Sequence, residues 1–464
     1  MEQSEQWVEH VAVYHPRNPK ESPLWNLLNN HYENFERNYQ QRFEKEYGFF
    51  RSVISEVVHD YLKCGDLKEG FARVRCPDCH HEYLLVFSCR GRWFCPSCHA
   101  KKVILFGEHL RHEILYPVPH RQYVFRIPKI LRVYFKYDRK LLGKLCQCAN
   151  ASLLTFLRTA TGIEDGVLGA VMTIHTFGDY CRWHPHVHGI VADGLFYGNG
   201  KFYVMPKKAD LNNLAAIFRA NVLQMLGKEG KIDDTLIKNI MGWRHMSGFS
   251  VHNGVRIARD DEEGKEGVAQ YIIRNPFSEA KLTYRKDTGM VIYKSKMTHG
   301  KDKRNFLVVD AEEFIALITQ HIPGKSHQLV RYYGFYSNRA RGERRKEAEQ
   351  EDLDSTVTSE EVEVIDVSSY KPRRLPSKTW RDCIKKVWEV DPLECPHCHA
   401  EMKIISFISK SQSEVIRKIL EHLGLWEEKI RPPPSNNILP HKTITYEPFD
   451  DGWPGYEEPC ITVD

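Results

Sequence analysis

Two pairs of cysteines constrain the fold of this chain more than any other feature. Cys76 and Cys79 form one CxxC pair, Cys95 and Cys98 form a second, and fifteen residues separate the pairs. Each pair can supply two thiolates to a tetrahedral zinc ion once a hairpin brings the pairs together. We therefore predict a structural Zn²⁺ site at these four cysteines.

Further ligand types lie close to the two pairs, so the identity of the four ligands stays open. Cys64 and Cys89 add two thiols, and three histidines could replace or support a cysteine: His80, His81 and His99. Two redox-active pairs, or buried cysteines without metal, are the alternative. Because a zinc site with four thiolates has no open position, we expect it to stabilise the fold and not to catalyse.

The remaining composition favours an intracellular protein of several domains. A chain of 464 residues is too long for one ordinary core. Six of its 13 cysteines lie in CxxC pairs and the rest are scattered, which is unlike a secreted disulfide pattern. The first thirty residues are polar and broken by prolines, unlike a signal peptide, and no apolar run is long enough for a membrane span. We expect a cytoplasmic protein without a membrane partner.

Positive charge is concentrated in two stretches, although the net charge is only +5. Twelve basic residues lie between Lys101 and Arg158, against three acidic ones. The second stretch mixes arginines with aromatic residues, including Arg331, Tyr332 and Tyr333. Such a mixture is typical of a groove that follows a single-stranded nucleic acid and stacks its bases. An ordinary solvated surface is the alternative.

The hydrophobic pattern predicts a multidomain α+β protein with a largely antiparallel central sheet. Strands are expected at 123–128, 167–177, 186–194, 201–206 and 249–257, and helices at 135–160, 209–227 and 262–274. We divide the chain into an N-terminal helical region (1–63), a zinc-binding domain (64–110), the central domain (121–342), a flexible, highly charged linker (343–376), a small C-terminal domain (377–430) and an irregular tail (431–464).

The small C-terminal domain contains a third CxxC pair, Cys395 and Cys398. One pair supplies half of a candidate second zinc site, which His397, His399 or Cys383 could complete. A small helical unit with free thiols is the alternative.

His186 and His188 stand two residues apart in a segment that alternates as a strand should. Alternation places both imidazoles on one face of the sheet. Two neutral imidazoles can hold a divalent cation and leave coordination positions open, as a catalytic metal requires. An HxH triplet is common by chance, and buried structural histidines are the alternative.

Tyr271 lies in the last turn of a charged helix that is expected to stop before Pro276, with Arg274 beside it. A tyrosine near a cation and a guanidinium can act as a nucleophile, while the metal polarises a phosphate oxygen. Packing in a core is the alternative.

Several longer motifs follow one another in a recognisable order. They are SCRGRWFCPSC (88–98), HPHVHGIVADG (184–194), SGFSVHNGVR (247–256), VAQYIIRNPFS (268–278), FIALITQHIP (314–323), LVRYYGFYSNRARG (329–342) and WEVDPLECPHCHAEM (388–402). This order resembles the bacterial rolling-circle insertion-sequence transposases, which join an N-terminal zinc-binding domain to an HUH tyrosine nuclease core, where U is a hydrophobic residue. The resemblance spans most of the chain from Cys64 to Met402.

The resemblance implies roles for individual residues. His186 and His188 would bind a catalytic Mg²⁺ or Mn²⁺, and Tyr271 would be the nucleophile. Some relatives have a second tyrosine four residues later, where this chain has Asn275. This departure favours a single nucleophile that acts repeatedly or in a homodimer. Asn275 is then a candidate third metal ligand, with His184 and His252 as competitors.

The activity implied is a metal-dependent transposase that nicks and rejoins single-stranded DNA at transposon ends and at the target through a 5′-phosphotyrosine intermediate. The DNA would be bound by Arg274, Arg331, Tyr332 and Tyr333, and the protein would lie at the bacterial nucleoid.

A non-catalytic zinc-ribbon regulator would explain the cysteines and the basic stretches, but not the histidine pair and the tyrosine helix. A metallohydrolase of the amidohydrolase type would need regular βα repeats, which the pattern lacks.

Overall fold

The computed structural model describes residues 18–426, apart from 92, 199, 207–209, 244–247, 295–305, 348–362 and 374–378. These residues form an α+β structure with several antiparallel sheets, which confirms the predicted fold class. The predicted tail, 431–464, lies outside the described residues. None of the described helices is both long enough and apolar enough to cross a membrane.

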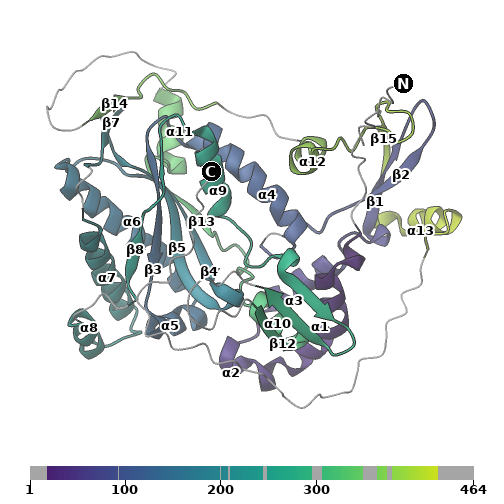
Figure 1. Ribbon diagram of the computed structural model, residues 1–464, viewed down its shortest axis with the longest axis horizontal. Coiled ribbons are helices and arrows are strands. Elements are labelled where there is room, and N and C mark those ends of the chain that lie inside the picture. Colours follow the sequence, from purple (N-terminus) through teal and green to yellow (C-terminus); the bar gives the residue numbers. More distant parts are fainter. Residues whose placement is uncertain are drawn as a thin grey trace, which may run out of the picture.

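A twisted antiparallel sheet forms the centre of the molecule (Figure 1). Its strands are, in spatial order, β13 (Val330–Gly334), β4 (Gly169–Phe177), β5 (Trp183–Ala192), β3 (His120–Arg126) and β8 (Ser250–His252), and the short β9 (Arg256–Ile257) also pairs with β3. The strands expected at 167–177 and 186–194 are therefore neighbours in the middle of the sheet.

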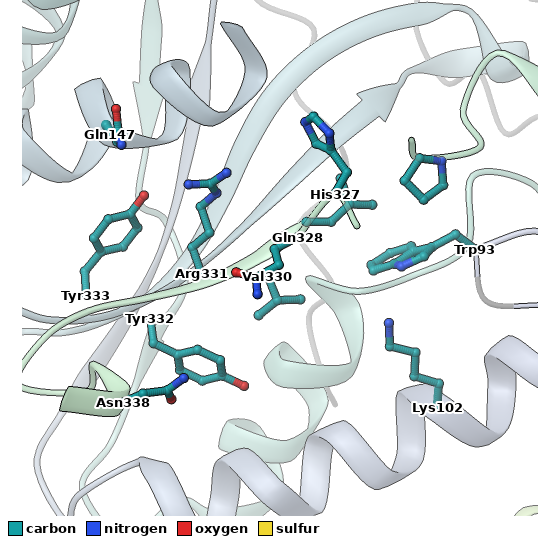
Figure 2. Close-up of a pocket in the computed structure, with 12 residues that line it drawn as sticks. Trp93, Lys102, Gln147, His327, Gln328, Val330, Arg331, Tyr332, Tyr333 and Asn338 are labelled. Carbon is teal, nitrogen blue, oxygen red and sulfur yellow. The ribbon is translucent and has the colours of Figure 1, made fainter. Parts of the chain in front are cut away.

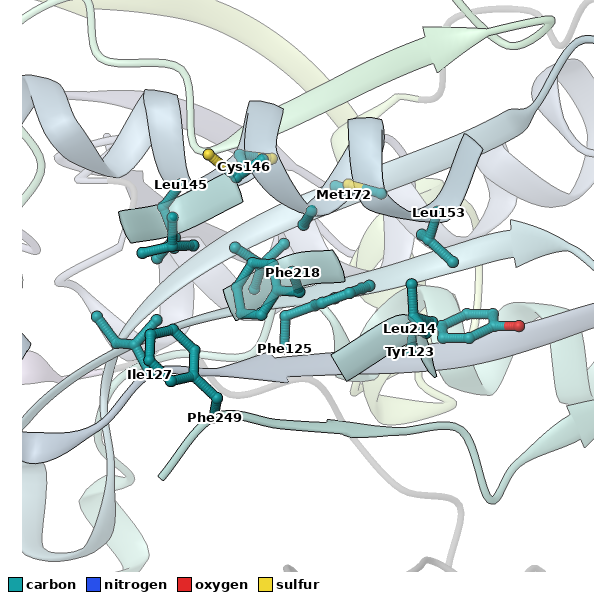
Figure 3. Packing of buried hydrophobic residues seen from close by; sticks show 14 of the residues in the cluster. Tyr123, Phe125, Ile127, Leu145, Cys146, Leu153, Met172, Leu214, Phe218 and Phe249 are labelled. Carbon is teal, nitrogen blue, oxygen red and sulfur yellow. The ribbon is translucent and has the colours of Figure 1, made fainter. Parts of the chain in front are cut away.

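One face of the central sheet is covered by helices and forms the largest hydrophobic core. The helices are α5 (Arg132–Tyr137), α6 (Lys140–Thr161), α7 (Leu211–Lys228) and α8 (Asp234–Met241). Figure 3 shows Phe125 and Met172 of the sheet packed against Phe218 of α7 and Leu153 of α6. Each fully buried side chain of this size contributes about 1.5–3 kcal/mol through removal from water, so this face holds the sheet in place.

The opposite face of the sheet is covered by α4 (Pro96–His109), the π-helical turn Leu110–Ile114 and α9 (Glu262–Tyr271). Val171 and Ile190 of the sheet pack there against Leu110 and Ile272. Because successive strand residues point to opposite faces, His186 and His188 lie on this second face together with Ile190. These two histidines are thus buried beneath α9.

The described part of the N-terminal region, from residue 18 on, is largely helical. It comprises α1 (Pro23–Arg42), α2 (Glu44–Tyr47) and α3 (Ser52–Leu62), which share one buried core with α10 (Ala311–Thr319) and with a three-stranded sheet of β10 (Leu282–Arg285), β11 (Met290–Lys294) and β12 (Phe306–Asp310). Segments more than two hundred residues apart in the sequence therefore form one structural unit.

A third sheet joins the two ends of the described chain. Strands β1 (Gly70–Arg75) and β2 (Glu82–Val86) form a hairpin, and β15 (Lys403–Ser409) pairs antiparallel with β1. Helices α12 (Trp380–Trp388) and α13 (Ser413–His422) flank β15 in the sequence and lie near this sheet in Figure 1.

The predicted linker, 343–376, is wrong where the structure describes it at its two ends. Residues up to Glu347 complete α11 (Asn338–Glu347), and β14 (Val364–Asp366) pairs with β7 (Lys201–Val204), which in turn pairs with β6 (Gly194–Tyr197). The physical reason is that Ile365 and Val367 are buried in the core beneath the central sheet. Because these few apolar residues lie in a highly charged segment, its composition predicted a linker and no buried strand. Residues 348–362 and 374–376 of the predicted linker lie outside the described part.

Candidate active site

Three buried histidines from two neighbouring strands form a compact cluster. His186 and His188 lie on β5, and His175 of β4 is paired directly opposite His186. One ring nitrogen of each lies within 4.8 Å of the others. The Nε2 atoms of His186 and His188 are 2.9 Å apart. Three nitrogens converging at this spacing match the donor set of a divalent metal ion.

Backbone carbonyls set the tautomers of two of these rings. Nδ1 of His186 donates to the carbonyl of His184 (2.7 Å), and Nε2 of His175 donates to the carbonyl of Ile272 (2.8 Å). Because a carbonyl oxygen can only accept, each of these nitrogens carries the ring proton. The opposite nitrogens, Nε2 of His186 and Nδ1 of His175, then hold lone pairs. Such outer hydrogen bonds are typical of histidines that bind metals.

The environment keeps His188 neutral. Burial lowers the pKa of His188 well below its usual value, and the neighbouring histidines together with Arg274 and Arg126 lower it further. A neutral imidazole is the form that binds a metal ion. The same two arginines place positive charge beside the site, where a phosphate group would carry negative charge.

Tyr271 and Arg274 lie against this cluster. The ring of Tyr271, the last residue of α9, is edge-on to that of His188 with 5.5 Å between the centroids. The Arg274 guanidinium carbon lies 4.6 Å from the centroid of the Tyr271 ring. A phenol, a guanidinium and three imidazoles therefore meet at one place.

Two histidines hold the backbone immediately after Tyr271. One is His175 of the cluster, bonded to the carbonyl of Ile272; the other is His99 of α4, whose Nε2 donates to the carbonyl of Ile273 (2.6 Å). Nδ1 of His99 accepts from the backbone N–H of Trp93 (3.2 Å). The segment that follows Tyr271 and contains Ile272 and Ile273, here called the tyrosine loop, is therefore held from two sides. The histidine cluster holds it on one side, and α4, which begins at the Cys95–Cys98 pair, holds it on the other.

The prediction that Asn275 lies one helical turn beyond Tyr271, on the same face, is wrong. Helix α9 ends at Tyr271 and the next residues form a turn. In the described structure, neither His184 nor His252 belongs to the cluster, and His252 is exposed on β8. The third histidine of the cluster is His175. It was missed from the sequence, because the pairing register of β4 and β5 depends on the turn between them.

The cysteines form two clusters, and the predicted pairing is wrong. Cys95 and Cys98 lie with Cys64 and Cys89, whereas the other predicted pair joins the C-terminal pair in a second cluster, comprising Cys76, Cys79, Cys395 and Cys398. In the first cluster, the Sγ atoms of Cys89 and Cys98 are 3.7 Å apart. The β1–β2 hairpin carries its cysteines towards β15, while Cys95 stands at the start of α4. Spacing alone could not show this division.

The edge of the central sheet lines a cavity of about 670 Å³ (Figure 2). Arg331, Tyr332 and Tyr333 of β13 contribute to its wall, as do Trp93 and Lys102. Tyr332 points to the face of the histidines, whereas its two neighbours point to the face of α6. The Lys102 ammonium lies 4.4 Å from the centroid of the Trp93 ring. The cavity therefore combines positive charge with aromatic side chains.

Comparison with known proteins identifies the class. Residues 169–344 match a family model described as "Putative transposase", and residues 28–127 match one described as "Transposase zinc-binding domain". The first match contains the three histidines and Tyr271; the second contains the first cysteine cluster. The chain is thus a transposase, and both its zinc-binding domain and its cysteine clusters support structural zinc.

Two curated relatives specify the kind of transposase. The chain is 26% identical over 377 residues to the transposase for insertion sequence element IS801 of Pseudomonas savastanoi pv. phaseolicola, covering 78% of this chain and 86% of that protein. It is 25% identical over 378 residues to "Putative transposase y4qJ" of Sinorhizobium fredii (strain NBRC 101917 / NGR234), covering 78% and 91%. No solved structure matches significantly. The chain belongs to the insertion-sequence transposases that carry this zinc-binding domain, which confirms the resemblance.

Proposed function

We propose that this transposase nicks and rejoins single-stranded DNA at transposon ends and at the target, through a 5′-phosphotyrosine on Tyr271, in a rolling-circle type of transposition. The observation that carries the proposal is the position of the Tyr271 ring against His188 of the buried histidine cluster, with Arg274 over the same ring. Tyrosine, guanidinium and imidazoles together are the groups needed to transfer a phosphoryl group to a protein side chain.

The histidine cluster fits a divalent ion. Metal binding at His175, His186 and His188 is favoured by their converging nitrogens, by the carbonyls that set the tautomers of His175 and His186, and by the lowered pKa of His188. A bound Mg²⁺ or Mn²⁺ would polarise a phosphate oxygen and stabilise developing charge. Because imidazole is a softer donor than carboxylate or water, the cluster favours Mn²⁺ over Mg²⁺.

The chain's own residues perform the transfer. The Tyr271 hydroxyl oxygen forms a bond to phosphorus and loses its proton, while the bond to the 3′-oxygen breaks and that oxygen takes up a proton. Arg274 and Arg126 balance the charge of the phosphate. Attack on the phosphotyrosine by a 3′-hydroxyl then restores a phosphodiester and frees the tyrosine, so no nucleotide cofactor is consumed. With Asn275 in the position of a second tyrosine, two transfers require reuse of Tyr271 or a homodimer.

The cavity at β13 is the proposed path of the DNA strand outside the site. Tyr332 offers a face on which a base can stack, and Lys102 and Arg331 offer charges for the phosphates. As a protein that acts on DNA in bacteria, it would work in the cytoplasm at the nucleoid.

The test is formation of a covalent adduct that survives denaturation. The purified protein is incubated with a labelled single-stranded transposon-end oligonucleotide and Mn²⁺. Wild type is expected to form the adduct, Tyr271→Phe to form none, and Tyr197→Phe, at an exposed tyrosine of another sheet, to behave as wild type. An adduct with Tyr271→Phe would contradict the proposal. DNA binding without any adduct would favour the zinc-ribbon regulator.

A further inference from the structure

Two short turns far apart in the chain have the same sequence pattern and the same backbone. They are CPDCH at 76–80 and CPHCH at 395–399. In each, the last residue has a left-handed backbone, with φ of 63° at His80 and 58° at His399. In each, the backbone N–H of the first cysteine donates to the carbonyl five residues later, at 2.8 and 3.0 Å. The two turns are therefore equivalent halves of one arrangement.

The sulfur atoms of the two turns face one another. Sγ of Cys76 lies 3.4 Å from that of Cys398, and Sγ of Cys79 lies 3.4 Å from that of Cys395. All four lie within 4.8 Å of one another, and none forms a disulfide. With zinc–sulfur bonds of about 2.3 Å, the corners of a tetrahedral site are about 3.8 Å apart. The observed spacing is close to this value.

The strands that carry the turns are built into one sheet. β1 leads into the first turn, β15 follows the second, and the two strands pair from Gly70 opposite Ser409 to Arg75 opposite Lys403. Cys76 and Cys395 are fully buried in one small cluster with Val74 and Met402. Neither turn alone supplies four thiolates, so each half depends on the other.

We propose that Cys76, Cys79, Cys395 and Cys398 bind a single zinc ion that fastens the C-terminal segment to the N-terminal zinc-binding domain. The closed loop contains the whole central domain. This second ion is separate from the one assigned to the Cys64 cluster, and it does not depend on the proposed phosphotyrosine chemistry.

Binding of this zinc ion also stabilises the surroundings of Tyr271. Helix α12 lies between the linker and the second turn, and the Lys386 ammonium on α12 is 2.8 Å from carboxylates of both Glu108 on α4 and Glu266 on α9. Fastening the C-terminal segment therefore keeps α12 against the two helices that hold the tyrosine loop.

Metal content of the full-length protein, purified under reducing conditions, tests the shared ion. Wild type is expected to hold two zinc ions per chain. Cys76→Ser/Cys79→Ser, Cys395→Ser/Cys398→Ser and the variant with all four changes should each hold one. Cys383→Ser, at a buried cysteine outside the cluster, should keep two. Retention of two ions by Cys395→Ser/Cys398→Ser, or loss of a further ion when all four are changed, would overturn the proposal.

A full-length chain with an added protease site tests whether the zinc ion links the two segments, without changing any of its ligands. A protease site replaces residues 374–378, and the protein is cut after folding. The C-terminal fragment should co-elute with the rest of the chain in the presence of zinc and separate when a chelator removes the ion. A fragment that stays attached after all zinc has gone, or that separates while carrying its own ion, would contradict the proposal.

Discussion

At the scale of single residues, the three clustered histidines are distinguished by what fixes each ring. His186 is set by a carbonyl two residues before it on its own strand, and His175 by the carbonyl of Ile272, next to Tyr271. His175 and Tyr271 are thus linked through a single residue, Ile272. Replacing His175 should affect both metal binding and the position of the nucleophile.

The first prediction concerns the third ligand. His175→Gln should lower the affinity for Mn²⁺ at least about tenfold, or roughly 1.4 kcal/mol, because one donor of three is lost. Asn275→Ala and His252→Ala should bind Mn²⁺ as wild type does. Titration followed by electron paramagnetic resonance measures all four proteins. If Asn275→Ala weakens binding and His175→Gln does not, the assignment of His175 is wrong.

The second prediction concerns a buried histidine outside the cluster. His321 is hydrogen-bonded to Thr176 and to the carbonyl of Cys181, and burial lowers its pKa to about 3. As the pH falls below about 6.5, the unfolded chain binds the proton first, so stability present at neutral pH is lost down to about pH 3. Between pH values of about 7.5 and 5.5, wild type should lose about 1.4 kcal/mol more than His321→Gln.

Urea unfolding of the two proteins at both pH values measures this difference. Changes in other groups cancel between wild type and variant, because only one histidine differs. Equal losses would show that His321 can be protonated in the folded protein.

At the scale of elements, alternation along one strand was enough to predict that His186 and His188 share a face. It could not identify His175, because the register of β4 against β5 depends on the connecting turn and on an irregularity between His175 and Phe177. The position at which α9 ends also could not be predicted from the local sequence pattern. Ile272 and Ile273 are buried, and their carbonyls bond to His175 and His99 instead of continuing the helix.

The third prediction follows from the bond between α4 and the tyrosine loop. His99→Leu leaves the buried carbonyl of Ile273 without its donor, which costs about 1–3 kcal/mol. We expect adduct formation to slow about tenfold or more, with zinc content, Mn²⁺ affinity and DNA affinity unchanged. His99→Gln can donate from its amide and should restore part of the rate. Slowing accompanied by loss of zinc would instead indicate a purely structural role.

At the scale of the whole molecule, the sequence indicated the α+β fold class and the cysteine-rich segments. It did not indicate which segments distant in the sequence pack together. Consecutive segments were treated as separate units, because periodicity and spacing carry only local information. The structure instead pairs β1 with β15 and packs α1 against α10. The same reason explains why the cysteine pairs were joined wrongly. Ligands separated by more than three hundred residues meet only through the tertiary fold.

The central claim is that Tyr271 becomes linked to a 5′-phosphate of single-stranded DNA in an ion-dependent reaction. The most direct measurement is to isolate the adduct formed by wild type with Mn²⁺, digest protein and DNA, and identify the modified peptide by mass spectrometry. We expect one nucleotide residue joined through its 5′-phosphate to the tyrosine of VAQYIIR (268–274), together with release of a free 3′-hydroxyl end. Attachment to another residue, or through a 3′-phosphate, would contradict this claim.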